Sequence, residues 1–279
     1  METLGYYNGQ YGEIDQMMIP MNDRVCFFGD GVYDATYAHN HIIYCLDEHV
    51  DRFYNSAKLL RFNLTMTKQE LKDLLQEMVR KLDSGDQFVY WQITRGTAPR
   101  NHAFPGETPV NLWITLRPKT NMPIDKELKL ISLEDTRFLH CNIKTLNLLP
   151  NVMAAQLTEE AGCDEAVLHR GDTVTECAHS NIHILKDGIL KTHPTDHYIL
   201  PGIARGELIK ACKKVGAGVD ETPFTMAELF AADEVIVTSS GTFCNRVVSV
   251  DAKPVGGKAG ALLKQLQDVL VTDFYERTK

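Results

Sequence analysis

Amphipathic helical segments alternate with short β-rich segments along this chain, and this alternation limits the folds that it can adopt. Apolar residues recur with the spacing of one helix face through residues 50–60, 71–82, 203–215 and 262–274. Thr67 and Glu70 have the spacing of a capping box, which predicts that the second of these helices starts there. Runs rich in β-branched and aromatic residues lie at residues 88–94, 110–116, 128–131, 166–168, 235–238 and 247–250. The pattern predicts a mixed fold of the α+β class with much β structure.

Glycine-containing segments predict two of the turns. The strand-like runs 182–185 and 189–192 flank Asp187-Gly188, a pair typical of a β-hairpin turn. Residues 29–31 read Gly-Asp-Gly but lack the third glycine of a dinucleotide-binding fingerprint. We interpret them as a turn before a strand that starts at Val32.

The chain is long enough for two domains. It has 279 residues, and a single hydrophobic core seldom grows beyond about 250 residues. Residues 117–123 follow a predicted strand and bracket polar side chains with Pro118 and Pro123, as an interdomain connection does. We therefore expect a first domain over residues 1–118, a linker over residues 119–123 and a second domain over residues 124–279.

Charge and composition argue against several classes of protein. The 29 Lys and Arg residues against 37 Asp and Glu residues give a net charge of −8, which disfavours a nucleic-acid partner. No apolar stretch approaches the ~20 residues needed to cross a bilayer, and the first residues do not resemble a secretory signal. The seven cysteines form no Cys-x-x-Cys pair and the ten histidines no metal motif. We expect a cytoplasmic protein with no membrane partner and no metal.

Three features indicate chemistry when they are taken together. Lys144 lies in an apolar stretch, residues 143–149, where burial would favour a neutral nucleophilic amine; a lysine with its head group in water gives the same pattern. Residues 200–203 precede the third helix, whose free N–H groups suit an anion or mark an ordinary helix start. The loop 95–102 carries two arginines and a histidine, which suit a carboxylate or form a solvated basic loop. Together they suggest an enzyme that uses pyridoxal phosphate on amino acids.

Six motifs carry a family resemblance. They are Phe28-Gly29-Asp30-Gly31-Val32-Tyr33, Glu48-His49-Val50-Asp51-Arg52, residues 94–102, Asn142-Ile143-Lys144-Thr145-Leu146-Asn147, Thr173-Val174-Thr175-Glu176 and Leu200-Pro201-Gly202-Ile203-Ala204-Arg205. In order and spacing the chain resembles the class IV pyridoxal-phosphate aminotransferases, and among these the D-amino acid aminotransferases, over about residues 4–250. The resemblance implies the cofactor pyridoxal 5′-phosphate and the two-domain fold type IV, with a small α/β N-terminal domain and a larger C-terminal domain with a barrel-like β core.

The resemblance also implies which residues hold the cofactor. Lys144 matches the lysine that binds the cofactor covalently and moves a proton at the substrate carbon. Glu176 matches the carboxylate that pairs with the pyridine nitrogen; without the resemblance it is a solvated residue at a strand end. Arg52 matches the cation on the cofactor phosphate; without the resemblance it is a cation on a helix surface. The other implied phosphate ligands are the backbone amides of Ile203 and Ala204 and the hydroxyls of Ser239 and Ser240.

Tyr33, Arg100 and His102 resemble the group that holds the substrate α-carboxylate in this family. The pair Arg100 and His102 favours D-amino acids, because fixing the carboxylate on one side decides which hydrogen points at Lys144. The resemblance therefore implies transfer of amino groups between D-amino acids, such as D-alanine and D-glutamate, and 2-oxo acids. In the family this loop reaches across a dimer interface, which implies a homodimer.

Departures from the D-enzyme pattern leave the substrate range open. Ala35, Tyr37, His179 and Gly241 stand where the family carries residues of other size or charge. His179 either sets specificity or only fills space. The alternative activities are an aminodeoxychorismate lyase and an aminotransferase for L-branched-chain amino acids, both of the same fold. A non-enzymatic pyridoxal-phosphate carrier or an acidic interaction module is a further alternative.

Overall fold

The chain separates into two units, each with its own sheet and core. A computed structural model describes residues 2–279. The first unit contains the residues up to Asn121 together with Ile143–Asn147 and Glu276–Lys279, and the second contains Met122–Asn142 and Leu148–Tyr275. The division after Asn121 falls inside the expected linker, residues 119–123. The expected second domain, residues 124–279, differs from the second unit, because the segment around Lys144 and the last four residues group with the first unit.

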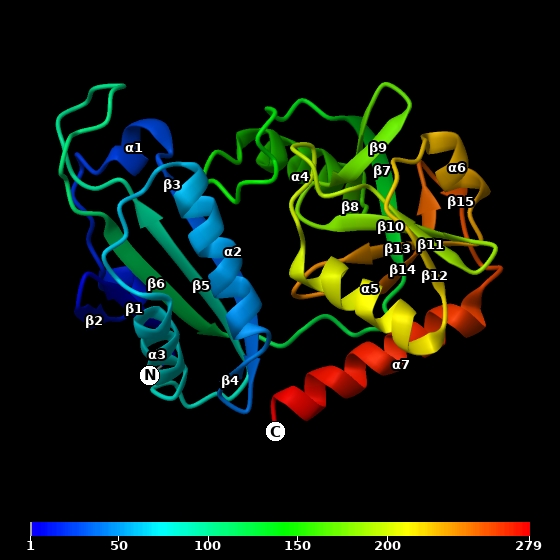
Figure 1. The fold of residues 1–279 in the computed structure, drawn as a ribbon, viewed down its shortest axis with the longest axis horizontal. Helices are drawn as coiled ribbons and strands as arrows, with labels where there is room; N and C mark the ends of the chain where they lie inside the picture. The colour runs from blue at the N-terminus through cyan, green and yellow to red at the C-terminus, as the bar shows by residue number, and fades with distance from the viewer. Residues whose placement is uncertain (1) are drawn as a thin grey trace. The chain divides into compact units, whose positions relative to one another are not determined.

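A six-stranded antiparallel sheet forms the base of the first unit (Figure 1). Its strands lie in the order β2-β1-β6-β5-β3-β4. They are β1 (Leu4–Tyr7), β2 (Gln10–Gly12), β3 (Gly31–His39), β4 (Ile42–Ile43), β5 (Gln87–Thr94) and β6 (Asn111–Pro118). The structure confirms the predicted strands at 88–94 and 110–116. Strand β3 begins at Gly31, one residue before the expected start at Val32.

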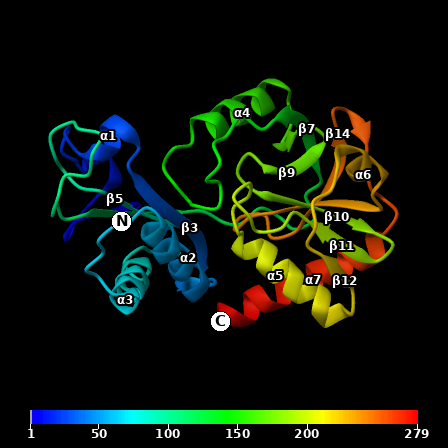
Figure 2. The same cartoon turned by 45° about the horizontal axis from the view of Figure 1, so that its top comes forward.

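Helices α2 (Leu46–Leu59) and α3 (Lys68–Val79) cover one face of this sheet, as Figures 1 and 2 show. The apolar face of α2 enters the core, where the ring of Phe53 lies 6.1 Å from that of Trp91 on β5. Thr67 caps the N-terminus of α3 in the predicted capping box, in which the Glu70 amide donates to Thr67 Oγ1 over 3.2 Å. The unit also contains the short helices η1 (Ile14–Gln16) and α1 (Arg24–Phe28).

A nine-stranded mixed sheet forms the second unit. The strand order is β12-β11-β10-β13-β14-β7-β8-β9, with β15 paired to β14. The pairs β11–β12, β14–β7 and β7–β8 are parallel and the others antiparallel. The strands are β7 (Leu128–Glu134), β8 (Glu165–Arg170), β9 (Thr173–Cys177), β10 (Asn181–Lys186), β11 (Ile189–Thr192), β12 (Gly218–Asp220), β13 (Glu234–Thr238), β14 (Asn245–Val250) and β15 (Lys253–Pro254).

This second sheet curls back on itself. Strand β9 ends the strand order, yet it leads directly into β10 through a tight turn in which the Cys177 amide donates to the Ser180 carbonyl over 2.8 Å. The strands β9 and β10 therefore lie close together, although β13, β14, β7 and β8 separate them in the sheet order. The curl gives the barrel-like β core that the family resemblance implied.

Four helices belong mainly to the second unit: α4 (Leu149–Glu160), α5 (Ile203–Val215), α6 (Met226–Ala231) and α7 (Gly260–Arg277). The periodicity predicted α5 and α7 but not α4 or α6. The hairpin between β10 and β11 is confirmed, with Lys186 paired to Ile189 and left-handed backbone at Asp187 (φ 51°) and Gly188 (φ 76°). Within residues 2–279, no helix has the length and apolarity required to span a membrane.

Candidate active site

Lys144 is held against β3 and α2 of the first unit. The Tyr33 amide donates to the Lys144 carbonyl over 3.0 Å, and the Leu146 amide donates to the Gly31 carbonyl over 3.1 Å. The Lys144 amide in turn donates to Ser56 Oγ of α2 over 3.2 Å. The ammonium group lies 4.3 Å from the centre of the Tyr33 ring. The side chain is half-buried rather than enclosed by its apolar sequence neighbours, one of which, Leu149, is 72% exposed.

Glycine at position 31 allows this close approach. A Cβ atom on Gly31 would lie 2.4 Å from the Ile93 carbonyl oxygen and 2.5 Å from Leu146 Cδ1. Both distances are shorter than van der Waals contact permits. The second glycine of the Gly-Asp-Gly turn is therefore required where the Lys144 segment pairs with β3.

Arg52 extends from α2 into a buried ion pair. Its Nε and Nη2 atoms donate to the two carboxylate oxygens of Asp34 over 2.9 and 2.7 Å. His49 Nδ1 lies 2.7 Å from the same carboxylate. Burial alone would raise the pKa of Asp34, but the charges and hydrogen bonds of Arg52 and His49 hold it well below its usual range. Arg52 is 8% exposed, so it is not a helix-surface cation, and Asp34 fixes the direction of its guanidinium group.

The three expected carboxylate ligands lie in two places on the first unit. Tyr33 stacks on Tyr90 of β5 with ring centres 5.4 Å apart, beside Lys144. Arg100 and His102 are exposed and both lie against Phe28, at 5.2 and 5.1 Å from its ring centre. Arg95, the other arginine of this loop, is instead a structural residue. Its side chain is buried against Asp30, with Nε 3.0 Å from the carboxylate.

Glu176 is the buried carboxylate of the second unit. Its Oε1 accepts from Arg137 Nη1, and its Oε2 accepts from Asn181 Nδ2 over 2.8 Å and from the Leu200 amide over 3.0 Å. The side chain is 7% exposed, which excludes the solvated strand end considered from the sequence. Burial raises the pKa of Glu176 to about 7, against the opposing charge of Arg137. The three donors favour the ionised form of Glu176, but burial outweighs them and brings its titration close to neutral pH.

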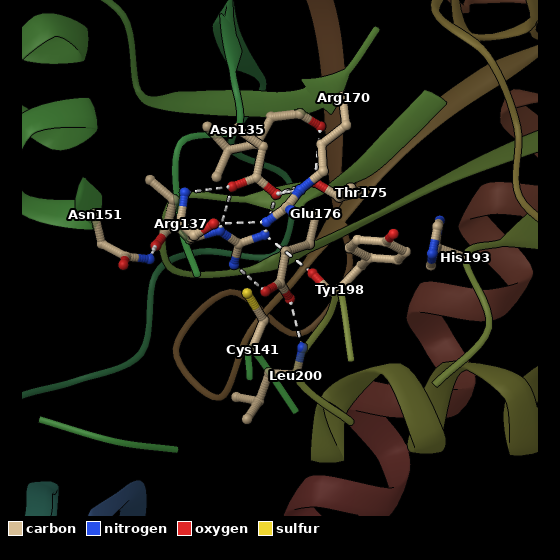
Figure 3. Close-up of polar contacts among 12 residues, drawn as sticks. Asp135, Arg137, Cys141, Asn151, Arg170, Thr175, Glu176, His193, Tyr198 and Leu200 are labelled. Atoms are coloured by element: carbon tan, nitrogen blue, oxygen red, sulfur yellow. Dashed lines mark hydrogen bonds and ion pairs between the residues drawn. The ribbon is translucent and has the colours of Figure 1, made fainter. Parts of the chain in front are cut away.

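Arg137 connects Glu176 to a second buried acid that the sequence analysis missed. Figure 3 shows its guanidinium group between Glu176 and Asp135, whose oxygens accept from Nε and Nη2 over 2.9 Å each. Arg170 and Thr175 also donate to Asp135 Oδ2, over 3.2 and 3.0 Å. Burial would raise the pKa of Asp135, but Arg137 and Arg170 outweigh it and lower the pKa to about 2. An acid and a base two residues apart, a few positions after the predicted strand 128–131, were the available sequence signal.

The expected phosphate donors of the second unit lie at a helix start and a strand end. Helix α5 begins at Ile203 after Gly202, and no side chain caps its first turn. A Cβ atom on Gly202 would lie 2.0 Å from Asn181 Oδ1, so the chain packs tightly at this point. Ser239 follows β13, and its hydroxyl lies 2.9 Å from Thr242 Oγ1. Ser240 is half-buried beside it. Uncapped amides and hydroxyls form a donor set that suits a phosphate group.

His179 is anchored away from the core. Its imidazole is 74% exposed and forms an ion pair with Glu165, whose own side chain is 4% exposed. The Ser180 hydroxyl donates to the same carboxylate over 2.8 Å. His179 therefore does not fill interior space.

Comparison with known proteins decides the family. A family model described as amino-transferase class IV matches residues 31–250, which is most of the chain. The chain belongs to the class IV aminotransferases. The resemblance found in the motifs is thus confirmed over the whole length that the family model covers.

Relatives named D-alanine aminotransferase are known from several organisms. The chain is 36% identical over 273 residues to the D-alanine aminotransferase of Listeria monocytogenes serotype 1/2a, covering 96% of this chain and 94% of that protein. It is 37% identical over 275 residues to the D-alanine aminotransferase of Bacillus licheniformis, with 98% and 97% covered.

Solved structures confirm the fold. The branched-chain amino acid aminotransferase from Escherichia coli has a TM-score of 0.90 at 22% identity, covering 100% of this chain and 96% of the other. The branched-chain aminotransferase from the archaeon Thermoproteus uzoniensis, solved with norvaline, has a TM-score of 0.88 at 21% identity, covering 98% and 95%. At this identity the likeness concerns the fold alone, which is the expected fold type IV.

Proposed function

We propose that this chain is a pyridoxal-phosphate-dependent aminotransferase that moves amino groups between D-amino acids and 2-oxo acids. The observation that carries the proposal is the likeness to proteins named D-alanine aminotransferase, at 36–37% identity over at least 94% of both chains. D-alanine and D-glutamate are the expected amino donors. The branched-chain enzymes share the fold at 21–22% identity. A likeness of fold at this identity does not indicate that the substrates are shared.

The residues present fit the cofactor. When bound, pyridoxal phosphate supplies an aldehyde that takes up the amino group and a ring that withdraws electrons from the substrate carbon. Lys144 offers a half-buried amine for covalent attachment and for moving the proton at the substrate Cα. Glu176, buried and ionisable near neutral pH, suits a protonated ring nitrogen. The phosphate would be held by Arg52, the amides of Ile203 and Ala204 and the hydroxyls of Ser239 and Ser240.

Tyr33, Arg100 and His102 are proposed to bind the substrate α-carboxylate. Arg100 and His102 are exposed in the single chain and share Phe28 as a support, so they are available to a carboxylate. A carboxylate held on one side presents one hydrogen of the substrate Cα to Lys144. Handedness then follows from the side on which the carboxylate is held.

Spectral titration of the holoenzyme tests the reaction and its handedness together. D-alanine and D-glutamate should convert the aldehyde form of the bound cofactor to the amine form, with the L-isomers far slower. Faster conversion by L-leucine than by any D-amino acid would support the branched-chain alternative instead. Release of pyruvate from aminodeoxychorismate would support the lyase alternative, and no conversion with any amino acid would support a non-enzymatic carrier.

Borohydride reduction followed by peptide mapping tests the attachment site. Reduction of the holoenzyme should fix the pyridoxyl group on Lys144, and Lys144→Ala should abolish the visible band of the attached cofactor. Lys210→Ala, which removes an exposed lysine of α5, is the control and should keep the band. A pyridoxyl group on any other lysine would refute the assignment.

We further propose a homodimer, and an exposed apolar stripe on α4 supports it. Leu149, Val152, Met153 and Leu157 lie at helical spacing and are 72%, 58%, 55% and 43% exposed. Four large apolar side chains that are exposed to water on one face of a helix indicate a protein–protein interface. Sedimentation of the wild type should give a dimer, and Val152→Glu with Met153→Lys should shift it toward the monomer. A monomeric wild type would contradict the proposal.

A cytoplasmic location is also proposed, from the odd number and wide spacing of the cysteines. Cell fractionation tests it.

A further inference from the structure

Strand β10 carries two buried polar side chains on one face, Asn181 and His183. Asn181 donates to Glu176 and, over 3.0 Å, to the Leu200 carbonyl just before α5. His183 is 0% exposed and lies between two hydroxyl groups. Its Nδ1 is 2.9 Å from Thr192 Oγ1 of β11, and its Nε2 is 2.8 Å from Thr238 Oγ1 of β13.

Arg205 extends this set of contacts to helix α5. Its Nε donates to Thr192 Oγ1 over 3.2 Å, and its Nη2 donates to the His193 carbonyl over 3.0 Å. Arg205 belongs to the first turn of α5, directly after Ile203 and Ala204. At the other end, Thr238 is the residue before Ser239. A continuous chain of hydrogen bonds, Arg205–Thr192–His183–Thr238, therefore joins the two places that carry the proposed phosphate donors of the second unit.

The imidazole of His183 suits this chain because it is neutral. Burial, together with the charge of Arg205, lowers the pKa of His183 to about 3. A neutral imidazole has one nitrogen that donates and one that accepts, and hydroxyl groups can take either role. The neighbouring β10 residues Ile182 and Ile184 are buried and apolar, so an apolar residue would be the ordinary choice for a core strand. The buried histidine therefore serves its two hydrogen bonds to hydroxyl groups rather than apolar packing.

We propose that His183 is a positioning residue for the cofactor phosphate. It holds Thr238, and with it Ser239 and Ser240, in register with Arg205 and the first turn of α5. This inference rests on the proposed function, because that function supplies pyridoxal phosphate as the ligand and places its phosphate at these donors. His183 acts through Thr192 and Thr238 and is not itself a phosphate ligand.

Binding to the apoprotein tests the proposal with three probes: pyridoxal phosphate, pyridoxal and inorganic phosphate. His183→Leu should weaken pyridoxal phosphate and inorganic phosphate by about ten-fold each, the effect of one or two hydrogen bonds, and should leave pyridoxal unchanged. Thr158→Val is the control, because Thr158 is 5% exposed in the same unit and its hydroxyl donates instead to the Ala154 carbonyl within α4. It should change none of the three affinities.

A second pair of variants keeps the test valid where His183→Leu fails to fold. Thr238→Val removes one hydroxyl of the chain and should reproduce the loss, and Thr238→Ser retains it and should bind as the wild type does. Equal weakening of pyridoxal and pyridoxal phosphate, or unchanged binding of phosphate by both disruptive variants, overturns the inference. So does a wild type that binds pyridoxal as tightly as pyridoxal phosphate. Phosphate binding that depends on His183 in a protein without aminotransferase activity would leave the inference standing and refute the proposed function.

Discussion

Two arginines of this enzyme are oriented by buried aspartates. Asp34 receives two hydrogen bonds from Arg52, and Asp135 receives two from Arg137. A guanidinium group that is fixed from one side has its remaining donors directed elsewhere. For Arg137 the other partner is Glu176, and for Arg52 the proposed partner is the cofactor phosphate.

Asp34→Asn should therefore weaken both stability and cofactor retention. The change removes a charge that is 0% exposed and takes this buried anion away from Arg52 and His49. Breaking a buried pair in this way costs about 3–5 kcal/mol, measurable by urea unfolding. Asp51→Asn on α2, next to Arg52 in the sequence, is the control, because the Asp51 side chain is 65% exposed and pairs with Lys68. Its cost should stay below about 1 kcal/mol, and similar costs for both variants would contradict the role of Asp34.

Arg137→Met should raise the pH at which the enzyme becomes fully active. Without Arg137 the pKa of Glu176 should rise above its present value of about 7, because the opposing positive charge is lost. A smaller fraction of Glu176 is then ionised at neutral pH, so the acidic limb of the pH–rate profile should move to higher pH. Arg137→Lys should restore part of the shift. An unmoved limb with a proportionally lower rate would indicate a purely structural role for Arg137.

At the scale of elements, close packing of the Lys144 segment on β3 gives a direct test. Gly31→Ala would place a methyl group against the Ile93 carbonyl and Leu146, and overpacking of this kind costs about 1–3 kcal/mol. Gly206→Ala is the contrasting change: position 206 lies within α5, has open space around it and should become more stable by up to about 1 kcal/mol. Thermal unfolding of the two variants should move in opposite directions. A Gly31→Ala protein as stable as the wild type would mean that the segment is loosely packed.

Helices and strands with one apolar face were predictable from the sequence. The other features depend on contacts between residues that are far apart in the sequence. Helix α2 was visible because its apolar residues face the core. Helix α4 was missed because its large apolar residues, such as Leu149 and Val152, lie on the exposed side. The motifs supplied the candidate site residues, but the residues that contact and support them were not predicted from the sequence. Arg137 meets Glu176 across 39 positions, and no local spacing encodes that pairing.

At the scale of the whole molecule, buried titratable groups contribute dependences of stability on pH that have opposite signs. The lowered pKa of Asp34 in the first unit contributes stability that is lost as the pH falls through the acidic range. The lowered pKa of His183 in the second unit likewise favours the folded state as the pH rises toward about 6.5. Glu176 has the opposite effect, because its pKa is raised on folding. The measured dependence of stability on pH is the sum of these contributions. A comparison of a variant with the wild type is therefore needed to isolate one of them.

The difference between Glu176→Gln and the wild-type apoprotein isolates the contribution of Glu176. Its pKa rises from 4.5 to about 7 on folding, so between these values the folded state binds more protons than the unfolded state. Wild-type stability therefore loses up to about 3 kcal/mol from this group as the pH rises through that window. Glutamine does not titrate, so the free energy of unfolding of Glu176→Gln minus that of the wild type should increase between pH 5 and pH 8. Urea unfolding at several pH values, followed by circular dichroism, measures it. A difference that stays flat between pH 5 and pH 8 would show that Arg137 outweighs burial and that Glu176 is ionised well below neutral pH.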